Sequence, residues 1–328
     1  MKVKTFLKYL LEKDVSQEQR TTYVLRLNEF NEFLKKKKNN IDSIPNGEII
    51  NYTEYLIQKN SNIVLDLLRA VINYANFIKK YDYIAEIIDI SESYNAMDNL
   101  YHRVAENFDE KLHDEIFEDI AIPPLGANPE KKHEFTKVIM KRLEEKIGEE
   151  KTLELLKPCL HGHPGDLEKE REVFLRINDI DEFLKVKKQE IIERLQKHQR
   201  EGTLEFAQYI DEEVIEYVKN NPTSSPGIRD GNIIIDIKMP YQAKKHLNAE
   251  DENMKRFYSC YCPWVRGAFK NGTDNEISSN FCHCSAGYIK LYWDKVFDQP
   301  TKVEPIETAL TGALVCKFAI HIPKEFQK

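Results

Sequence analysis

Five of the six cysteines lie in the last 69 residues of this 328-residue chain, and no other feature constrains the fold of its C-terminal half as strongly. The sixth, Cys159, lies near the middle. In a reducing compartment thiols stay free, and clustered free thiols more often indicate metal binding or catalysis than packing. The five clustered residues are Cys260, Cys262, Cys282, Cys284 and Cys316.

The remaining composition is that of a globular protein, with 41% hydrophobic and 31% charged residues. No stretch approaches the roughly 18 uninterrupted apolar residues of a membrane span. The N-terminal apolar stretch is short, is interrupted by Lys8 and Glu12, and has no small-residue cleavage site, so it does not read as a signal peptide. We therefore expect a soluble, cytoplasmic protein with no membrane partner.

A change of charge along the chain predicts a change of module near residue 82. Residues 1–82 hold 14 basic against 10 acidic side chains, a net of +4, whereas residues 83–120 hold 11 acidic against 2 basic, a net of −9. The strong breaker Ile122-Pro123-Pro124-Leu125-Gly126 follows. The predicted parts are a helical module at 1–82, an acidic helical connector at 83–124, and an α+β domain rich in Cys and His at 125–328.

Residues 1–82 carry the apolar spacing of a small all-helical domain. One helix is predicted from about Ser16 to the Lys35–Lys38 run, and a second from about Glu48 to Lys59. Ser61 is the expected cap of a third helix, whose apolar stripe runs to Ile78. The apolar face of the first helix consists of Tyr23, Leu27, Phe30 and Leu34.

This pattern resembles the helical core-binding (SAM-like) domain at the front of phage-type tyrosine recombinases. The matching runs are SQEQRTTYVLRLNEFNEFL, IINYTEYL and INYANFIKK. In that family the domain clamps DNA, so the resemblance implies DNA as a partner of residues 1–82. Nothing downstream matches the Arg–His–Arg–Tyr set of the family's catalytic domain, which argues against recombinase activity. The Lys35–Lys38 run can contact phosphates, although such a run is also an ordinary solvated helix end.

The last hundred residues change from helical to strand-like patterns. NIIIDIK at 232–238 reads as a strand, and residues 286–297 read as an amphipathic helix. Residues 302–310 and 314–322 are predicted as two strands joined across Thr311-Gly312-Ala313. The predicted fold class is therefore an α+β C-terminal domain with a closing β-hairpin, preceded by an all-α helical N-terminal domain.

Two Cys-x-Cys motifs, at residues 260–262 and 282–284, are the first candidates for chemistry. Thiolates bind zinc at about 2.3 Å, and four of them make a closed structural site. In an extended strand the two sulfurs of Cys-x-Cys lie about 7 Å apart, so both bind one metal only where the chain turns. A metal site, a reactive thiol without metal, and inert packing all remain open for these cysteines.

The segment Cys159-Leu160-His161-Gly162-His163-Pro164 is a second candidate. Two imidazoles and a thiol in a tight loop can provide a base beside a nucleophile, or metal ligands. The alternative is a turn whose histidines hydrogen-bond backbone carbonyls. A further hypothesis is that this loop and the C-terminal cysteines line one pocket, although the sequence does not give the distance between them.

Acidic and aromatic residues near the cysteines complete the candidate set. Glu304 and Glu307 can complete a zinc shell or act as bases, unless they are simply exposed on a surface strand. Trp264, Tyr288 and Trp293 can wall an apolar small-molecule pocket, unless they belong to the core.

Residues 281–323, from FCHCSAGY to CKFAIHIP, resemble the C-terminal part of the 4-vinyl-reductase-type ligand-binding domain. They are also similar to L-2-amino-thiazoline-4-carboxylate hydrolase-like proteins. The zinc ligands of the vinyl-reductase-type domain correspond here to Cys282 or Cys284, to Glu304 or Glu307, to position 308, and to Cys316. Position 308 is Thr308, so one thiolate of that pattern is absent unless Cys262 or the second member of the Cys282/Cys284 pair substitutes.

The leading hypothesis is a small-molecule-binding, sensor-like protein with a cysteine-anchored zinc site. The alternative is a cysteine- or metal-dependent hydrolase of a ring C–N or C–S bond, and a purely structural zinc protein is the third class. No phosphate loop or dinucleotide motif is present, so no nucleotide cofactor is expected. The sequence does not fix the oligomeric state. The predicted metal ligands are Cys262, Cys282, Cys284, Cys316, Glu304 and Glu307; the predicted ligand-binding residues are Cys159, Trp264, Tyr288 and Trp293; the catalytic residues of the alternative are Cys282, Cys284, His161 and His163.

Overall fold

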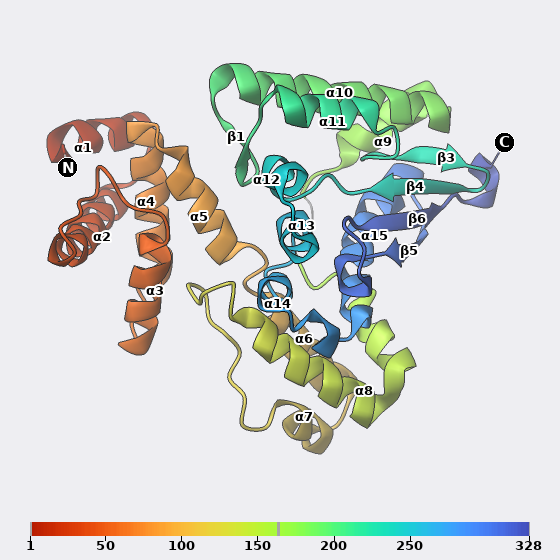
Figure 1. Cartoon of the computed structure of the whole chain (residues 1–328), viewed down its shortest axis with the longest axis horizontal. Coiled ribbons are helices and arrows are strands. Elements are labelled where there is room, and N and C mark those ends of the chain that lie inside the picture. Colours follow the sequence, from red (N-terminus) through yellow and green to blue (C-terminus); the bar gives the residue numbers. More distant parts are fainter. Residues whose placement is uncertain (1, 163–164, 328) are drawn as a thin grey trace. The chain divides into compact units, whose positions relative to one another are not determined.

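The computed structural model describes residues 2–162 and 165–327, and the chain divides into two compact units (Figure 1). Unit 1 comprises Met1–Tyr94 and Pro123–Lys131, and unit 2 comprises Asn95–Ile122 and Lys132–Lys328. Unit 1 is helical and unit 2 contains the sheets, so the predicted α+β class with an all-α N-terminal part is confirmed. Independent folding of residues 1–82 stays a prediction.

Unit 1 is built from five helices in the described chain, and local signals set where two of them begin. The Ser16 side chain caps α2 by accepting a hydrogen bond from the backbone N–H of Gln19 at 3.2 Å. The Gln19 side chain in turn accepts a hydrogen bond from the backbone N–H of Ser16. The predicted cap at Ser61 is wrong, because α4 begins only at Val64 and has no side-chain cap. The helices are α1 (Val3–Glu12), α2 (Gln17–Lys36), α3 (Glu48–Gln58), α4 (Val64–Ile78) and α5 (Tyr81–Ser91).

The core of unit 1 includes the apolar face predicted for α2, whose four residues are all buried. The chain returns to this core at residues 123–131, where Leu125 packs against it. The Thr53 hydroxyl donates to the carbonyl of Gly126 at 2.8 Å. Gly126 has a φ of +97°, and a Cβ there would lie 2.8 Å from Val64 Cγ1. Glycine is therefore required at this position for two reasons: the backbone φ is positive, and there is no room for a Cβ atom.

Unit 2 combines helices with a four-stranded antiparallel sheet of order β3-β4-β6-β5 (Figure 1). Among the described residues, no helix is long and apolar enough to cross a membrane. The helices are α6 (Ala96–Asn107), α7 (Glu110–Phe117), α8 (Lys132–Leu156), α9 (Glu168–Ile177), α10 (Ile180–Glu201), α11 (Glu212–Asn220), α12 (Ala243–Asn248), α13 (Glu252–Ser259), α14 (Arg266–Asn271) and α15 (His283–Phe297). The strands are β1 (Leu204–Glu205), β2 (Gln208–Tyr209), β3 (Ile228–Asp230), β4 (Ile233–Ile237), β5 (Lys302–Glu307) and β6 (Lys317–His321).

The closing hairpin is present, but its connection is longer than predicted. β5 and β6 pair antiparallel, and residues 308–316 join them in place of a tight turn at 311–313. A 3₁₀ turn shortens both strands, because the Thr308 N–H donates to Thr311 Oγ1 at 2.9 Å and the Thr311 N–H donates to the Thr308 carbonyl at 3.0 Å.

Two of the hydrophobic clusters of unit 2 meet the opposite ends of α15. Cys284, in its first turn, belongs to the cluster that also contains Trp264 and parts of α6 and α8. Trp293 and Phe297, further along the helix, belong to the cluster against the sheet. Cys316 packs against both clusters. The N-terminal turn of α15 is thus the place where the cysteines meet the helical core.

Replacing Gly126 by Ala is expected to destabilise unit 1 more than the same change at Gly47. Both glycines have positive φ, but a Cβ at Gly47 would meet nothing within 4 Å. The added clash at Gly126 should cost about 1–3 kcal/mol beyond the shared backbone strain. Hydrogen exchange of the α3 and α4 amides in the full chain measures the difference. Equal loss of protection in the two variants would contradict the packing described for this segment.

Candidate functional site

One group of three metal-ligating side chains stands out in the described part of the chain: Cys159, His161 and Cys284, whose ligand atoms all lie within 4.8 Å of one another. Cys159 and His161 lie in the loop that follows α8, and Cys284 lies in the first turn of α15. Cys284 is buried, whereas the other two are half-buried. The loop and Cys284, widely separated in sequence, therefore form one site.

Helix α6 holds the loop in place through two polar side chains. The Arg103 guanidinium donates to the carbonyls of Pro158 at 2.6 Å and Cys159 at 3.2 Å. The Asn99 amide donates to the carbonyl of Leu160 at 2.7 Å. Because these bonds satisfy consecutive backbone carbonyls, they fix the direction in which the Cys159 side chain leaves the loop.

The loop also approaches α15 very closely, at Gly287. A Cβ at this position would lie 2.2 Å from the carbonyl oxygen of Lys157 and 2.9 Å from the backbone nitrogen of Cys159. Real Cβ atoms do not come this near to backbone, so any other residue would push the loop away. Gly287 is thus what allows the thiols of Cys159 and Cys284 to meet.

The two thiols of the site are held in opposite protonation states. The hydrogen bond from Cys284, helped by the ring and the backbone N–H of His161, lowers the pKa of Cys159 to about 5 against the opposing effect of burial. The same contact, together with burial, raises the pKa of Cys284 well above its usual value. At neutral pH the pair therefore carries one thiolate, on Cys159, and one thiol, on Cys284.

His161 completes the site on its more exposed side. Its Nε2 lies 3.9 Å from Cys284 Sγ, and its ring meets Tyr288 edge-on with ring centroids 5.9 Å apart. Tyr288 is exposed, whereas Cys284 also accepts the Leu160 N–H at 3.3 Å from within the core. The site therefore spans the boundary between the surface and the core.

The other four cysteines form a second group, in which Cys260 is buried and Cys262, Cys282 and Cys316 are half-buried. Burial raises the pKa of Cys260 well above its usual value, and the neighbouring Cys262, Cys316 and Cys282 raise it further. Burial, together with Cys316, raises the pKa of Cys282 to about 12, while a hydrogen bond with Thr308 opposes this. These positions thus lie close enough to influence one another, although in the described residues the 4.8 Å spacing is met by the first group alone.

The predicted acidic ligands lie on β5 and have cationic partners there. Glu304 contacts Lys302 and His321, both at 2.8 Å, and Lys302 is the larger cause of the lowered pKa of Glu304. Glu307 lies 3.7 Å from Lys317. Metal binding by these two glutamates stays a prediction.

The predicted aromatic residues separate into core and surface. Trp264 and Trp293 are 0% and 2% exposed and lie in the two different clusters. Tyr288 is the aromatic residue of the set that contacts the cysteine and histidine site. His163 lies outside the described residues.

Sequence reasoning did not find the residues that position the site. Arg103 and Gly287 belong to no motif for metal binding, although Arg103 is one of only two basic side chains among residues 83–120. The available signal was that Arg103 is one of two cations in an acidic segment. Gly287 gave a signal only as part of the Ala286-Gly287-Tyr288 helix start, whose close approach to the loop is a tertiary contact.

Comparison with known proteins identifies one part of the chain. The family model of the N-terminal SAM-like domain of phage integrases matches residues 3–75, which confirms the recombinase-like resemblance of the N-terminal module. No curated protein and no solved structure matches the chain. The comparisons give no support to the resemblance of residues 281–323 to the 4-vinyl-reductase-type domain.

Metal-free protein should show one cysteine that alkylates at unusually low pH. Because the pKa of Cys159 is about 5, its iodoacetamide reaction rate should reach half its plateau near that pH. Gly287→Ala should move the midpoint upward by separating the loop from Cys284. Peptide mass spectrometry assigns the labelled residue, and Cys159→Ser serves as the control. A midpoint near the ordinary thiol value of about 8.5 would contradict the electrostatics described here.

Proposed function

We propose that unit 2 is a small-molecule-binding, sensor-like module built on a zinc centre with Cys159, His161 and Cys284 as ligands. The observation that supports this is the convergence of two sulfurs and one imidazole nitrogen within 4.8 Å. Zinc requires thiolates and neutral imidazole, and one of the two thiols is already ionised at neutral pH.

The spacing between Cys284 and His161 is close to that of two ligands of tetrahedral zinc. Zinc–sulfur bonds of about 2.3 Å and zinc–nitrogen bonds of about 2.0 Å place tetrahedral ligand atoms about 3.5–3.8 Å apart. The Cys284 Sγ to His161 Nε2 distance is 3.9 Å, so only a small movement would be needed. Three protein ligands leave a fourth position, and a donor atom of a small molecule would occupy it. Tyr288 would form part of the wall beside that position.

We further propose that unit 1 contacts DNA. The match of residues 3–75 to the SAM-like domain of phage integrases supports this, as does the basic end of α2. Lys35 pairs with Glu32 and Lys37 with Glu48, whereas Lys36 and Lys38 are exposed and make no ion pair among the described residues. A chain with both units would be a DNA-contacting protein that responds to a metal or small molecule.

One observation favours hydrolysis as a second candidate function. The thiolate of Cys159 lies beside His161, and a thiolate next to an imidazole is the arrangement that nucleophilic cysteine catalysis uses. In such an enzyme the Cys159 thiolate would attack the ring carbon, and the ring C–N or C–S bond would break as the leaving atom takes a proton from His161. Water, losing a proton to His161, would then cleave the bond to Cys159 and release the product. The raised pKa values of Cys282 and Cys284 make them poorer nucleophiles. Rapid alkylation of Cys159 in the zinc-bound protein would favour this enzyme over the sensor.

Protein purified anaerobically should contain about one zinc per chain, measured by elemental analysis. Cys159→Ser, His161→Ala and Cys284→Ser should each lower the zinc content several-fold because each removes one of only three protein ligands. His102→Ala changes an exposed histidine outside the site and should leave the zinc content unchanged. Cys316→Ser tests whether the second group also binds metal. Fully folded protein without zinc would refute the proposal.

The double substitution of Lys36 and Lys38 by Glu should weaken binding of the full chain to a duplex DNA. Loss of two phosphate contacts should also lower the slope of log affinity against log salt by about 2. The charge-matched control replaces Lys151 and Lys197, two exposed lysines of unit 2, by Glu. Fluorescence anisotropy over a salt series measures both effects. Equal weakening in the two variants would show only non-specific charge attraction, and would contradict a DNA-contacting role for the end of α2.

A further inference from the structure

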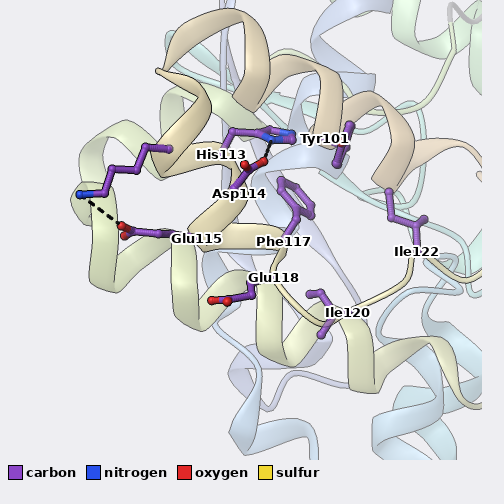
Figure 2. Close-up of a pocket in the computed structure, with 9 residues that line it drawn as sticks. Tyr101, His113, Asp114, Glu115, Phe117, Glu118, Ile120 and Ile122 are labelled. Carbon is purple, nitrogen blue, oxygen red and sulfur yellow. Dashed lines mark hydrogen bonds and ion pairs between the residues drawn. The ribbon is translucent and has the colours of Figure 1, made fainter.

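In the described chain, unit 2 has two groups of side chains outside the proposed zinc centre that are candidates for a further site. One is the pocket between α6, α7 and the segment that follows α7, where Figure 2 shows Tyr101 and Phe117 together with the exposed carboxylates of Asp114 and Glu118. Its aromatic rings pack on one another, and exposed carboxylates are common at protein surfaces, so this pocket does not point to a particular ligand. The other is the second cysteine group, where four ligands of one chemical kind come together.

Lys238, directly after β4, contacts all three segments of the chain that carry these cysteines. Its backbone N–H donates to the carbonyl of Cys316 at 3.0 Å, and its Nζ lies 5.6 Å from the ring centroid of Tyr261, the middle residue of the first Cys-x-Cys motif. The same Nζ donates to Ser285 Oγ at 2.6 Å, in the first turn of α15 that follows Cys282. The three cysteine-bearing segments therefore converge around one lysine.

The connection between β5 and β6 lies against the same group. Its 3₁₀ turn Ala309–Thr311 contacts a second 3₁₀ turn, Ser279–Cys282. Backbone N–H groups of the first of these turns face the sulfurs of Cys282 and Cys316. N–H donors directed at sulfur stabilise metal-bound thiolates, so this turn provides part of the surroundings that a metal–thiolate site needs.

The four thiols are free and share one environment. Cys260 is buried and the other three are half-buried. The other three thiols act electrostatically on Cys260, and the Lys238 ammonium acts on Cys316 with the opposite sign. Soft thiolates bind copper(I), zinc or an iron–sulfur cluster rather than hard cations. Four thiols at one place therefore limit the ligand to one of these metals.

The spacing of these sulfurs favours a cluster over a single ion. A tetrahedral zinc with bonds of about 2.3 Å holds its sulfur ligands about 3.8 Å apart. Among the described residues, no three of these four sulfurs lie within 4.8 Å of one another. An iron–sulfur cluster with four cysteine ligands places iron ions and sulfides between the cysteines, so it fits a wider group of thiols.

We propose that unit 2 holds an iron–sulfur cluster, whose ligands are Cys260, Cys262, Cys282 and Cys316. Lys238 lies beside this cluster and offsets part of the negative charge of the four thiolates. Cys260 replaces Cys284 in the ligand set predicted from the sequence. The cluster shares no ligand with the proposed zinc centre and does not depend on it.

Metal and sulfide analysis of the full chain tests the proposal. Protein is purified anaerobically, incubated with ferrous iron, sulfide and a thiol reductant, and desalted before iron, acid-labile sulfide and zinc are measured. We expect about two or four irons per chain with an equal amount of sulfide, and visible absorption that dithionite bleaches, because both common clusters take four cysteines. Folded protein that takes up no iron, or iron without sulfide, would overturn the proposal.

Two neighbouring cysteines give a matched pair of variants. Cys282→Ser removes a cluster ligand and should lower the iron content several-fold, whereas Cys284→Ser should keep the iron and lower only the zinc. Cys260→Ser should behave as Cys282→Ser does. Circular dichroism checks the fold of each variant, and the iron and sulfide content of the unchanged chain tests the proposal where a variant does not fold. Iron kept in folded Cys282→Ser and Cys260→Ser would identify adventitious iron sulfide and overturn the proposal.

Discussion

The close approach between the 157–160 loop and helix α15 is the contact on which the candidate site depends. At Gly287 the helix has no side chain, and the loop backbone fills the space that a Cβ would need. Arg103 holds the loop from its other side. Two weak sequence signals, a glycine near a helix start and an arginine in an acidic segment, thereby determine whether Cys159 and Cys284 can act together.

The protonation states within the site determine what the site can do. Cys159 is ionised at neutral pH because Cys284 donates to it, and Cys284 keeps its proton for the same reason. Binding of the proposed zinc would therefore remove a proton from Cys284, and its affinity is expected to rise with pH through the neutral range. Without metal, the same pair is a thiolate beside a buried thiol, which is the state suited to nucleophilic chemistry. The zinc and hydrolase hypotheses thus describe two uses of one electrostatic arrangement.

The sequence predicted the elements better than the contacts between them. Apolar spacing and Ser16 located α2, because a helix face and its cap are local properties. Cys159, His161 and Cys284 were recognised as chemical residues, but their proximity depends on a tertiary contact at Gly287. The longer connection of the β5–β6 hairpin was missed because side-chain bonds between Thr308 and Thr311, rather than Gly312 alone, shape it.

Cobalt(II) substitution shows whether Cys159, His161 and Cys284 bind one metal together. Cobalt in a tetrahedral site with thiolate ligands absorbs strongly in the visible and shows sulfur-to-metal charge transfer in the near ultraviolet, whereas octahedral oxygen sites absorb weakly. If these three residues bind the metal, the tetrahedral spectrum appears at one cobalt per chain, with weaker charge transfer in Cys159→Ser and an unchanged spectrum in Cys316→Ser. A spectrum that is lost in Cys316→Ser but kept in Cys159→Ser would place the metal in the second cysteine group instead.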